Sequence, residues 1–250
     1  MILVAPPTPT TQEPVIPNYG GPPGGAHGCI ATNGHFCWDW VTANWDGLLQ
    51  PHLIQHLELT AIAVSIGFVL AFGAALVAYR MRWFETPFSA FSAFLYTIPS
   101  LALFQLLVPF TGIGWVTVEI GLVGYTLLIL FRNTLEGLRG VPPSVLEAAR
   151  GMGLTGLQTL RRVELPLALP AIAAGVRIAV VTTISLATVA AYITPLGLGQ
   201  PIFYGLQSDF NTEFIATGAL AVALAIAADV ALVLLQRALT PWVRARRSRA

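Results

Sequence analysis

Long apolar stretches alternate with short polar segments along most of the chain. A helix needs roughly 18 or more mostly apolar residues, at about 1.5 Å each, to cross a hydrocarbon core of about 30 Å. Five stretches reach that length and predict five transmembrane helices. They cover residues 57–79, 88–110, 113–131, 168–193 and 213–235. The pattern therefore predicts an all-α, polytopic membrane helix bundle.

The connection between the third and fourth predicted spans, residues 132–167, is polar and, at about 36 residues, too long to be left unstructured. Ser144 to Glu147 (SVLE) and Thr155 to Gln158 (TGLQ) both have the pattern of a capping box. In that motif the hydroxyl accepts from the amide three residues on, and the Glu or Gln side chain accepts from the first amide. We expect two short helices, at about 145–151 and 156–164, with the Gly-Met-Gly segment as the turn.

The basic residues are distributed asymmetrically between the predicted connections. All 13 are arginines, and they follow the first, third and fifth spans, apart from Arg177 within the fourth. Residues 1–56 and the connections at 111–112 and 194–212 contain none. Because basic residues near span ends are retained in the cytoplasm, we expect the N-terminus outside and the C-terminus inside. The polar connection then lies in the cytoplasm.

Composition excludes several classes of protein. The chain is 55% hydrophobic and only 10% charged, which a soluble domain of 250 residues rarely is. It contains no lysine, whereas a nucleotide-binding P-loop needs one to reach the phosphates. His52 and His56 have i,i+4 spacing but no third ligand beside them, so a solvated or interfacial helix face is expected there and not a metal site. We expect no enzymatic activity, no cofactor and no nucleic-acid partner.

The segment before the first span, residues 1–56, is expected to lie outside the membrane. Its first 36 residues are rich in Pro and Gly and predict a flexible arm, and the tryptophans that follow predict a segment at the membrane interface. The opening residues lack the basic region of a signal peptide, so we expect them to be retained. Cys29 and Cys37 both face the oxidising side in this topology, where either a disulfide or two unpaired thiols would fit.

Two features inside the predicted spans are candidates for function. Arg177 and Asp229 are ionisable residues within the fourth and fifth spans, and we expect them to pair across the bundle interior as a lock or gate. The second span contains a proline, which leaves a backbone carbonyl without its helical hydrogen bond. Such a carbonyl is tolerated in a membrane where it lines a cavity. We therefore place a candidate translocation path at Tyr96, Thr97, Pro99 and Ser100.

The polar connection also carries a recognisable motif. The segment EAARGMGLTGLQTLRRVELPLALP, residues 147–170, resembles the EAA motif of permeases of ATP-binding cassette importers. In that motif Gly follows E-A-A after three residues, and an aliphatic residue, a variable residue and Leu-Pro follow after nine more. The matching residues are Glu147, Ala148, Ala149, Gly153, Val163, Leu165 and Pro166, with Gly151 in the same turn.

The resemblance implies a partner for this connection. In such importers the loop forms a coupling helix that rests on a cytosolic ATPase dimer, which binds ATP and Mg²⁺. A second permease subunit, identical or different, completes the pore, and an extracytoplasmic binding protein delivers the substrate. Movement of the coupling helices then rocks the helix bundles between inward-facing and outward-facing states.

The resemblance covers residues 57–235 and is closest to permeases for glycine betaine, carnitine, choline and proline betaine. It implies a permease domain over 57–235 with a coupling loop at 132–167, preceded by the external segment 1–56. A basic tail, 236–250, follows and is expected to contact anionic lipid. An importer of another small solute such as methionine, and a stand-alone channel or secondary transporter, are the alternatives. The resemblance to the osmoprotectant permeases is carried by three segments, YTIPSLALFQLL, RNTLEGLRGVPPSVLEAARGMG and PLGLGQPIFYGL.

Overall fold

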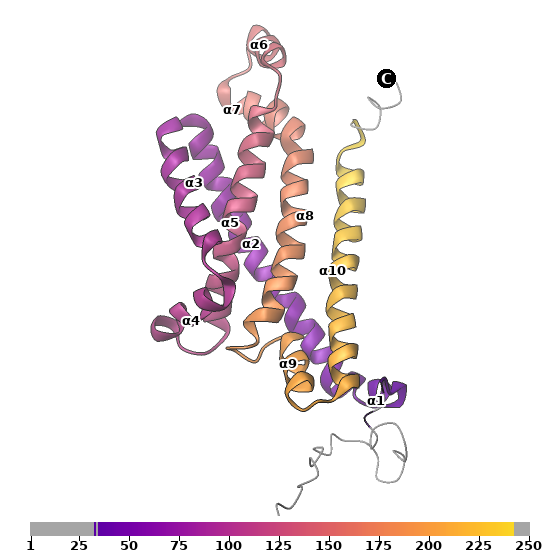
Figure 1. Ribbon diagram of the computed structural model, residues 1–250. Helices are drawn as coiled ribbons and strands as arrows, with labels where there is room; N and C mark the ends of the chain where they lie inside the picture. Colours follow the sequence, from indigo (N-terminus) through magenta and orange to yellow (C-terminus); the bar gives the residue numbers. More distant parts are fainter. Residues whose placement is uncertain (1–32, 34, 243–250) are drawn as a thin grey trace, which may run out of the picture.

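The computed structural model describes residue 33 and residues 35–242. Helices and the turns between them make up this part of the chain, and it contains no strand (Figure 1). The helices are α1 (Trp38–Ala43), α2 (Gln50–Arg80), α3 (Arg82–Thr97), α4 (Ser100–Thr111), α5 (Trp115–Arg139), α6 (Pro143–Gly151), α7 (Gly156–Thr159), α8 (Leu165–Ala190), α9 (Gly199–Gln207) and α10 (Asn211–Leu239). Two π-helical turns, η1 (Trp45–Leu49) and η2 (Leu160–Glu164), precede α2 and α8.

Four of the predicted spans are confirmed as single long helices. Helices at 45–80, 115–139, 156–190 and 211–239 are long and apolar enough to cross a membrane, and a bent pair brings the number to as many as five. The bent pair is α3 with α4, whose axes differ by 102°. An unbroken span over 88–110 is therefore wrong. Pro99 forces the residue before it, Ile98, into an extended conformation with ψ of 129°, and the helix ends there.

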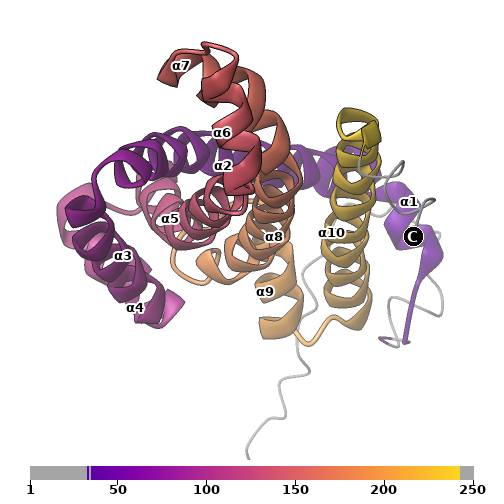
Figure 2. The same ribbon diagram turned by 90° about the horizontal axis from the view of Figure 1, so that it is seen from above.

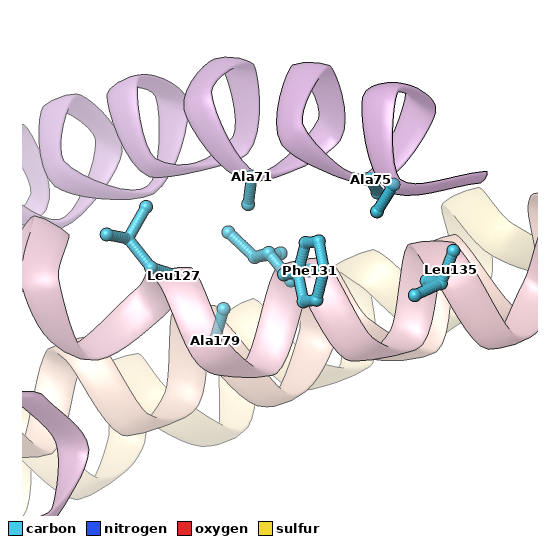
Figure 3. Close-up of a cluster of buried hydrophobic side chains, with 8 residues drawn as sticks. Ala71, Ala75, Leu127, Phe131, Leu135 and Ala179 are labelled. Atoms are coloured by element: carbon cyan, nitrogen blue, oxygen red, sulfur yellow. The ribbon is translucent and has the colours of Figure 1, made fainter. Parts of the chain in front are cut away.

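Small side chains let three helices pack closely at the centre of the bundle. Figure 3 shows Ala71 and Ala75 of α2 facing Leu127, Phe131 and Leu135 of α5, with Ala179 of α8 beside them. At Gly67 of α2, a Cβ atom would lie 1.9 Å from the Oγ1 of Thr126 in α5. Helices in membranes approach one another through such small residues, since lipid removes most of the hydrophobic driving force between them.

α10 lies at the edge of the bundle, beside α8 and α9 (Figure 2). Its apolar side chains, such as Val222, Ile226 and Leu234, are mostly exposed. Two polar contacts join it to α8 within the membrane-length part of the helices. Gln236 Nε2 donates to the carbonyl of Pro170 over 3.2 Å, and Asp229 accepts from Arg177.

The segment before α2 is more closely packed than an interfacial position predicts. Trp40 of α1 is buried, and its ring meets Phe210 edge to face with centroids 5.3 Å apart. The amide of Cys37 donates to the Thr212 hydroxyl over 2.9 Å, so α1 is attached to the start of α10. Trp38, by contrast, is exposed. Cys29 lies outside the described residues, and its disulfide with Cys37 stays a prediction.

Candidate functional site

The polar connection between α5 and α8 folds into an elbow that projects from one end of the bundle. Figure 1 shows α6 and α7 beyond the ends of α5 and α8, on the side opposite to α1 and α9. We call the segment Pro143–Glu164, which comprises α6, α7 and η2, the elbow. The two predicted short helices are confirmed, with bounds within two residues at the start of the first and with η2 completing the second.

The first predicted capping box is wrong. The N-cap of α6 is Pro142, Pro143 occupies the first turn, and no side chain caps the helix. Pro143 suits that position because its missing N–H is one of the amides that a helix start leaves unpaired. Ser144 therefore lies inside the helix, and Glu147 lies too far along it to act as a cap. The Glu147 side chain is exposed instead.

The second capping box is confirmed. The Thr155 amide donates to Gln158 Oε1 over 2.8 Å, and the Gln158 amide donates to Thr155 Oγ1 over 3.4 Å. Both capping partners therefore support the start of α7, as the motif requires.

A Schellman turn ends α6 and fixes the bend of the elbow. The Leu154 amide donates to the Ala149 carbonyl over 3.1 Å, and the Gly153 amide donates to the Arg150 carbonyl over 2.9 Å. Gly153 has φ of +79°, the left-handed conformation that this turn needs and that glycine adopts without steric cost. The glycine of the motif is thus explained by backbone geometry.

The faces of α6 differ from the sequence prediction in one respect. Ala149 is 1% exposed and packs toward its own chain, so it forms no part of an outer surface. Glu147 and Ala148 are exposed, and Met152 at the bend is 73% exposed. Of the motif, Glu147, Ala148 and the bend from Gly151 to Gly153 therefore lie on the outer surface of the elbow.

The elbow continues into α8 without a break. The sequence predicts a short helix at 156–164 and a separate span at 168–193, but residues 156–190 form one helical run. Pro166 lacks the N–H that would bond to the carbonyl four residues before it. The π-helical turn η2 ends two residues before this proline, and η1 likewise ends two residues before Pro51. A widened turn is one way in which a helix accommodates a missing bond.

Two hydrogen bonds attach the elbow to the end of α2. Tyr79 Oη donates to Glu164 Oε1 over 3.2 Å, and Arg80 Nη2 donates to the Gly156 carbonyl over 3.4 Å. The other carboxylate oxygen of Glu164 is buried and has no hydrogen-bond partner among the residues that the structure describes. These contacts enclose a hollow of about 300 Å³ that Arg150 also lines. Sequence reasoning missed Tyr79 and Glu164, although Glu164 stands directly before the Leu-Pro of the motif.

The opposite end of α2 holds the turn between α8 and α9. His56 is 0% exposed, and both of its ring nitrogens have backbone partners. Nδ1 accepts from the Leu198 amide over 3.2 Å, and Nε2 lies 3.1 Å from the Ile184 carbonyl. Gln55 Oε1 accepts from the Gly197 amide over 2.7 Å. The prediction of a solvated or interfacial face is therefore wrong for His56.

The predicted path residues lie at the break between α3 and α4. The Tyr125 hydroxyl of α5 donates to the carbonyl of Ile98, which the helix break leaves free. Thr97 Oγ1 donates within its own helix to Phe94, while Pro99 and Ser100 begin α4. Tyr96 is 42% exposed and meets Tyr125 edge to face. A tyrosine of a neighbouring helix thus satisfies the free carbonyl, a contact that no local sequence pattern signals.

Arg177 and Asp229 are joined by an ion pair, as expected. Arg177 Nη2 donates to Asp229 Oδ2 over 2.8 Å, and Nε donates to the other oxygen. The expectation that they meet in the bundle interior is wrong, because their side chains are 43% and 31% exposed. They bridge α8 and α10 at a partly open face near the middle of both helices.

Comparison with known proteins identifies the family. The family described as "Binding-protein-dependent transport system inner membrane component" matches residues 63–245. The chain belongs to this family. It is a transport component of the inner membrane, and the elbow lies within the matched part of the permease. The match begins inside α2, so the segment before residue 63 lies outside it.

Relatives of the permease cover most of its length. It is 37% identical over 188 residues to the glycine betaine/carnitine/choline transport system permease protein OpuCB of Bacillus subtilis, covering 75% of this chain and 86% of the relative. It is 38% identical to the choline transport system permease protein OpuBB of Bacillus subtilis, over 78% of this chain and 90% of the relative. It is 38% identical to the osmoprotectant import permease protein OsmW of Salmonella typhimurium, over 78% of this chain and 93% of the relative.

Solved structures share the fold. The MetNI methionine ABC transporter in an inward-facing conformation matches with a TM-score of 0.68 and 24% identity, covering 78% of the permease and 98% of that chain. A chain of an amino acid ABC transporter matches with a TM-score of 0.63 and 20% identity, covering 79% and 97%. The helix arrangement is therefore that of an ABC transporter permease.

Alanine variants of Arg177 and Asp229 test whether their ion pair stabilises the contact between α8 and α10. If the pair holds α10 against α8, Asp229→Ala leaves Arg177 unpaired at membrane depth, which is costly. We expect each single alanine variant to lose thermal stability in detergent. The double variant is expected to lose less than the sum of the two, with a coupling of at least about 0.5 kcal/mol. Additive losses, or a neutral Asp229→Ala, would contradict a structural role.

Proposed function

We propose that this permease forms the translocation pathway of an ATP-driven importer for small osmoprotectants such as glycine betaine, choline, carnitine or proline. The observation that carries the proposal is the elbow. The EAA segment folds into a projecting helix and turn, with Glu147 and Ala148 exposed on its surface. A chain without a P-loop lysine has to receive the work of ATP hydrolysis from another subunit, and this surface is where we place the contact.

The partners follow from that arrangement. A cytosolic ATPase dimer with ATP and Mg²⁺ would bind the elbow, and a second permease subunit, identical or different, would complete the pore. A binding protein would deliver the substrate at the opposite face. The elbow end then lies in the cytoplasm with the C-terminus, the N-terminal segment lies outside, and the arginine distribution supports this orientation. The permease itself would hold no cofactor and would catalyse no reaction.

The path of the force is set by the contacts of the elbow. η2 runs directly into α8, so a displacement of α6 would move the base of that helix. Tyr79 and Arg80 attach the elbow to α2, whose other end binds the turn at Gly197. A push at the elbow would therefore act on two spans and on the turn at their far ends. Such rigid-body motion of packed helices is one of the ways in which transporters alternate access.

Substrate competition in whole vesicles tests the proposal. The permease, its ATPase and its binding protein are reconstituted, and uptake of radiolabelled glycine betaine is measured with unlabelled glycine betaine, choline or methionine in excess. We expect glycine betaine and choline to compete and methionine to have no effect. No uptake of glycine betaine, together with uptake of radiolabelled methionine by the same vesicles, would assign the permease to amino-acid import. The names of the relatives support the first outcome, whereas the methionine transporter shares the fold at 24% identity.

A further inference from the structure

A second hollow lies along the groove between α3 and α5, away from the elbow. Its volume is about 330 Å³, near the lower end of the range of about 300–1,000 Å³ that small-molecule sites occupy. The residues from α3 are small or carry hydroxyls, and α5 contributes one guanidinium. The lining residues are Glu85, Thr86, Ser89, Ala90, Ala93 and Arg132.

Arg132 is the uncompensated charge of this hollow. It makes no hydrogen bond or ion pair within the described part of the chain, and Glu136, one helical turn away on α5, does not pair with it. The carboxylate of Glu85 is already engaged, since Arg139 Nη1 and Nη2 donate to its two oxygens over 2.7 and 2.5 Å. The charges of Glu85 and Arg139 neutralise each other, so the hollow retains the positive charge of Arg132.

Arg132 is exposed and lies toward the elbow end of α5, so its guanidinium is accessible from the hollow. It lies seven residues before the end of α5, about 10 Å along a helix that is long and apolar enough to span a membrane. A solute that enters the hollow can therefore reach the guanidinium. The Thr86 and Ser89 side chains line the same hollow and make no hydrogen bond with the described residues.

The face of α3 that lines the hollow continues along the helix toward the break. Thr86, Ala90, Ala93 and Thr97 recur at intervals of four, three and four residues, which places them on one face of α3. This face leads from the hollow to the break at Pro99, where Tyr96 is also exposed. A small solute in the groove between α3 and α5 would therefore pass Arg132 and the break in succession.

We propose that Arg132, with the hydroxyls of Thr86 and Ser89, forms a subsite for the carboxylate of zwitterionic substrates. The proposal rests on the proposed function. A guanidinium presents two parallel N–H donors that match a carboxylate, and hydroxyls add further donors. Glycine betaine and carnitine have such a carboxylate, whereas choline has a hydroxyl in its place. The subsite would bind osmoprotectants that have a carboxylate and would not bind choline. A guanidinium with two hydroxyls also suits a carboxylate better than an apolar or cationic group.

The two substrate classes supply the test. Uptake of radiolabelled glycine betaine and of choline is measured for the whole reconstituted importer, and their ratio is compared between wild type and Arg132→Gln. Loss of a charge-assisted hydrogen bond is expected to lower the ratio about ten-fold or more, with choline uptake within about two-fold of wild type. Arg132→Lys keeps the charge without the paired donors, so its uptake ratio is expected to lie between those of wild type and Arg132→Gln. The binding protein is the same in every arm, so a changed ratio arises from the permease.

Matched variants and lipids separate other roles of Arg132. Arg237→Gln removes an exposed arginine near the end of α10 and is expected to leave the ratio unchanged. Vesicles are prepared with neutral lipid alone and with added anionic lipid. If Arg132 binds a phosphate headgroup or a neighbouring subunit, its loss changes both substrates equally, and an unchanged ratio overturns the proposal.

A folding defect does not leave the proposal untested. If Arg132→Gln fails to insert, the ratio is measured for Thr86→Val with Ser89→Ala, which removes both hydroxyls and leaves the charge. A selective loss of glycine betaine uptake by that variant supports the subsite, and an unchanged ratio overturns it. Absence of uptake of both substrates by the wild-type importer would instead contradict the proposed function.

Discussion

Replacing Gly153 with leucine is expected to abolish substrate uptake while the permease still inserts into the membrane. Gly153 has φ of +79°, where any other L-residue except Asn or Asp costs roughly 1–2 kcal/mol. Apart from its neighbours in sequence, no atom of the described residues lies within 4 Å of a Cβ built there, so a side chain would project outward from the bend. Under the proposed function, the new side chain would therefore meet the ATPase and not the permease core.

The expected readout is uncoupling. Uptake by the reconstituted importer should fall at least about ten-fold, because an obstructed interface loses the contacts that transmit the motion. ATP hydrolysis should no longer respond to substrate-loaded binding protein. Gly153→Asn is the matched control, since Asn tolerates the left-handed conformation, and we expect it to retain a larger share of uptake. Full uptake by Gly153→Leu would remove the bend from the coupling interface.

Replacing His56 with leucine is expected to destabilise the permease more than any other single change at the α9 end. His56 is 0% exposed, and leucine can neither accept from the Leu198 amide nor donate to the Ile184 carbonyl. Each buried group left without a partner costs about 1–3 kcal/mol, so the two groups together give an expected loss of about 2–6 kcal/mol. The midpoint of thermal unfolding in detergent measures the loss.

His52 provides the comparison for that experiment. It lies one turn earlier on α2 and is only partly buried, with Nδ1 2.7 Å from the Leu48 carbonyl and Nε2 3.1 Å from Gln200 Oε1. Water can replace these partners, so His52→Leu is expected to lower the midpoint much less. Equal shifts for the two variants, or no shift for His56→Leu, would show that α2 does not hold the α8–α9 turn through this ring.

The features that could be predicted from the sequence follow from local chemistry. Apolar length specifies the four long spans, and the capping pattern at Thr155 and Gln158 specifies the start of α7. The second glycine of Gly-Met-Gly suits a left-handed turn, and Gly153 adopts one. Each of these depends on a few neighbouring residues, so no tertiary contact was needed to infer it.

The features that could not be predicted depend on competition or on distant contacts. Ser144 has the sequence of a cap, but Pro143 is better suited to the first turn and shifts the helix start to Pro142. The buried face of α6, which contains Ala149, is set by how the elbow lies against the bundle. His56 finds its partners 128 and 142 residues further along the chain. A single sequence carries no signal for such pairings.

We propose that ATP hydrolysis by a separate subunit drives import through this permease, with the elbow as the contact. Uptake of glycine betaine into vesicles containing the permease, ATPase and binding protein tests it most directly. One set of vesicles has ATP on the elbow side, another has a non-hydrolysable ATP analogue, and a third has only a sodium or proton gradient. We predict uptake only in the vesicles that have ATP, and loss of that uptake in the Gly153→Leu variant. Uptake driven by the ion gradient without ATP would contradict the account and assign the permease to the secondary transporters.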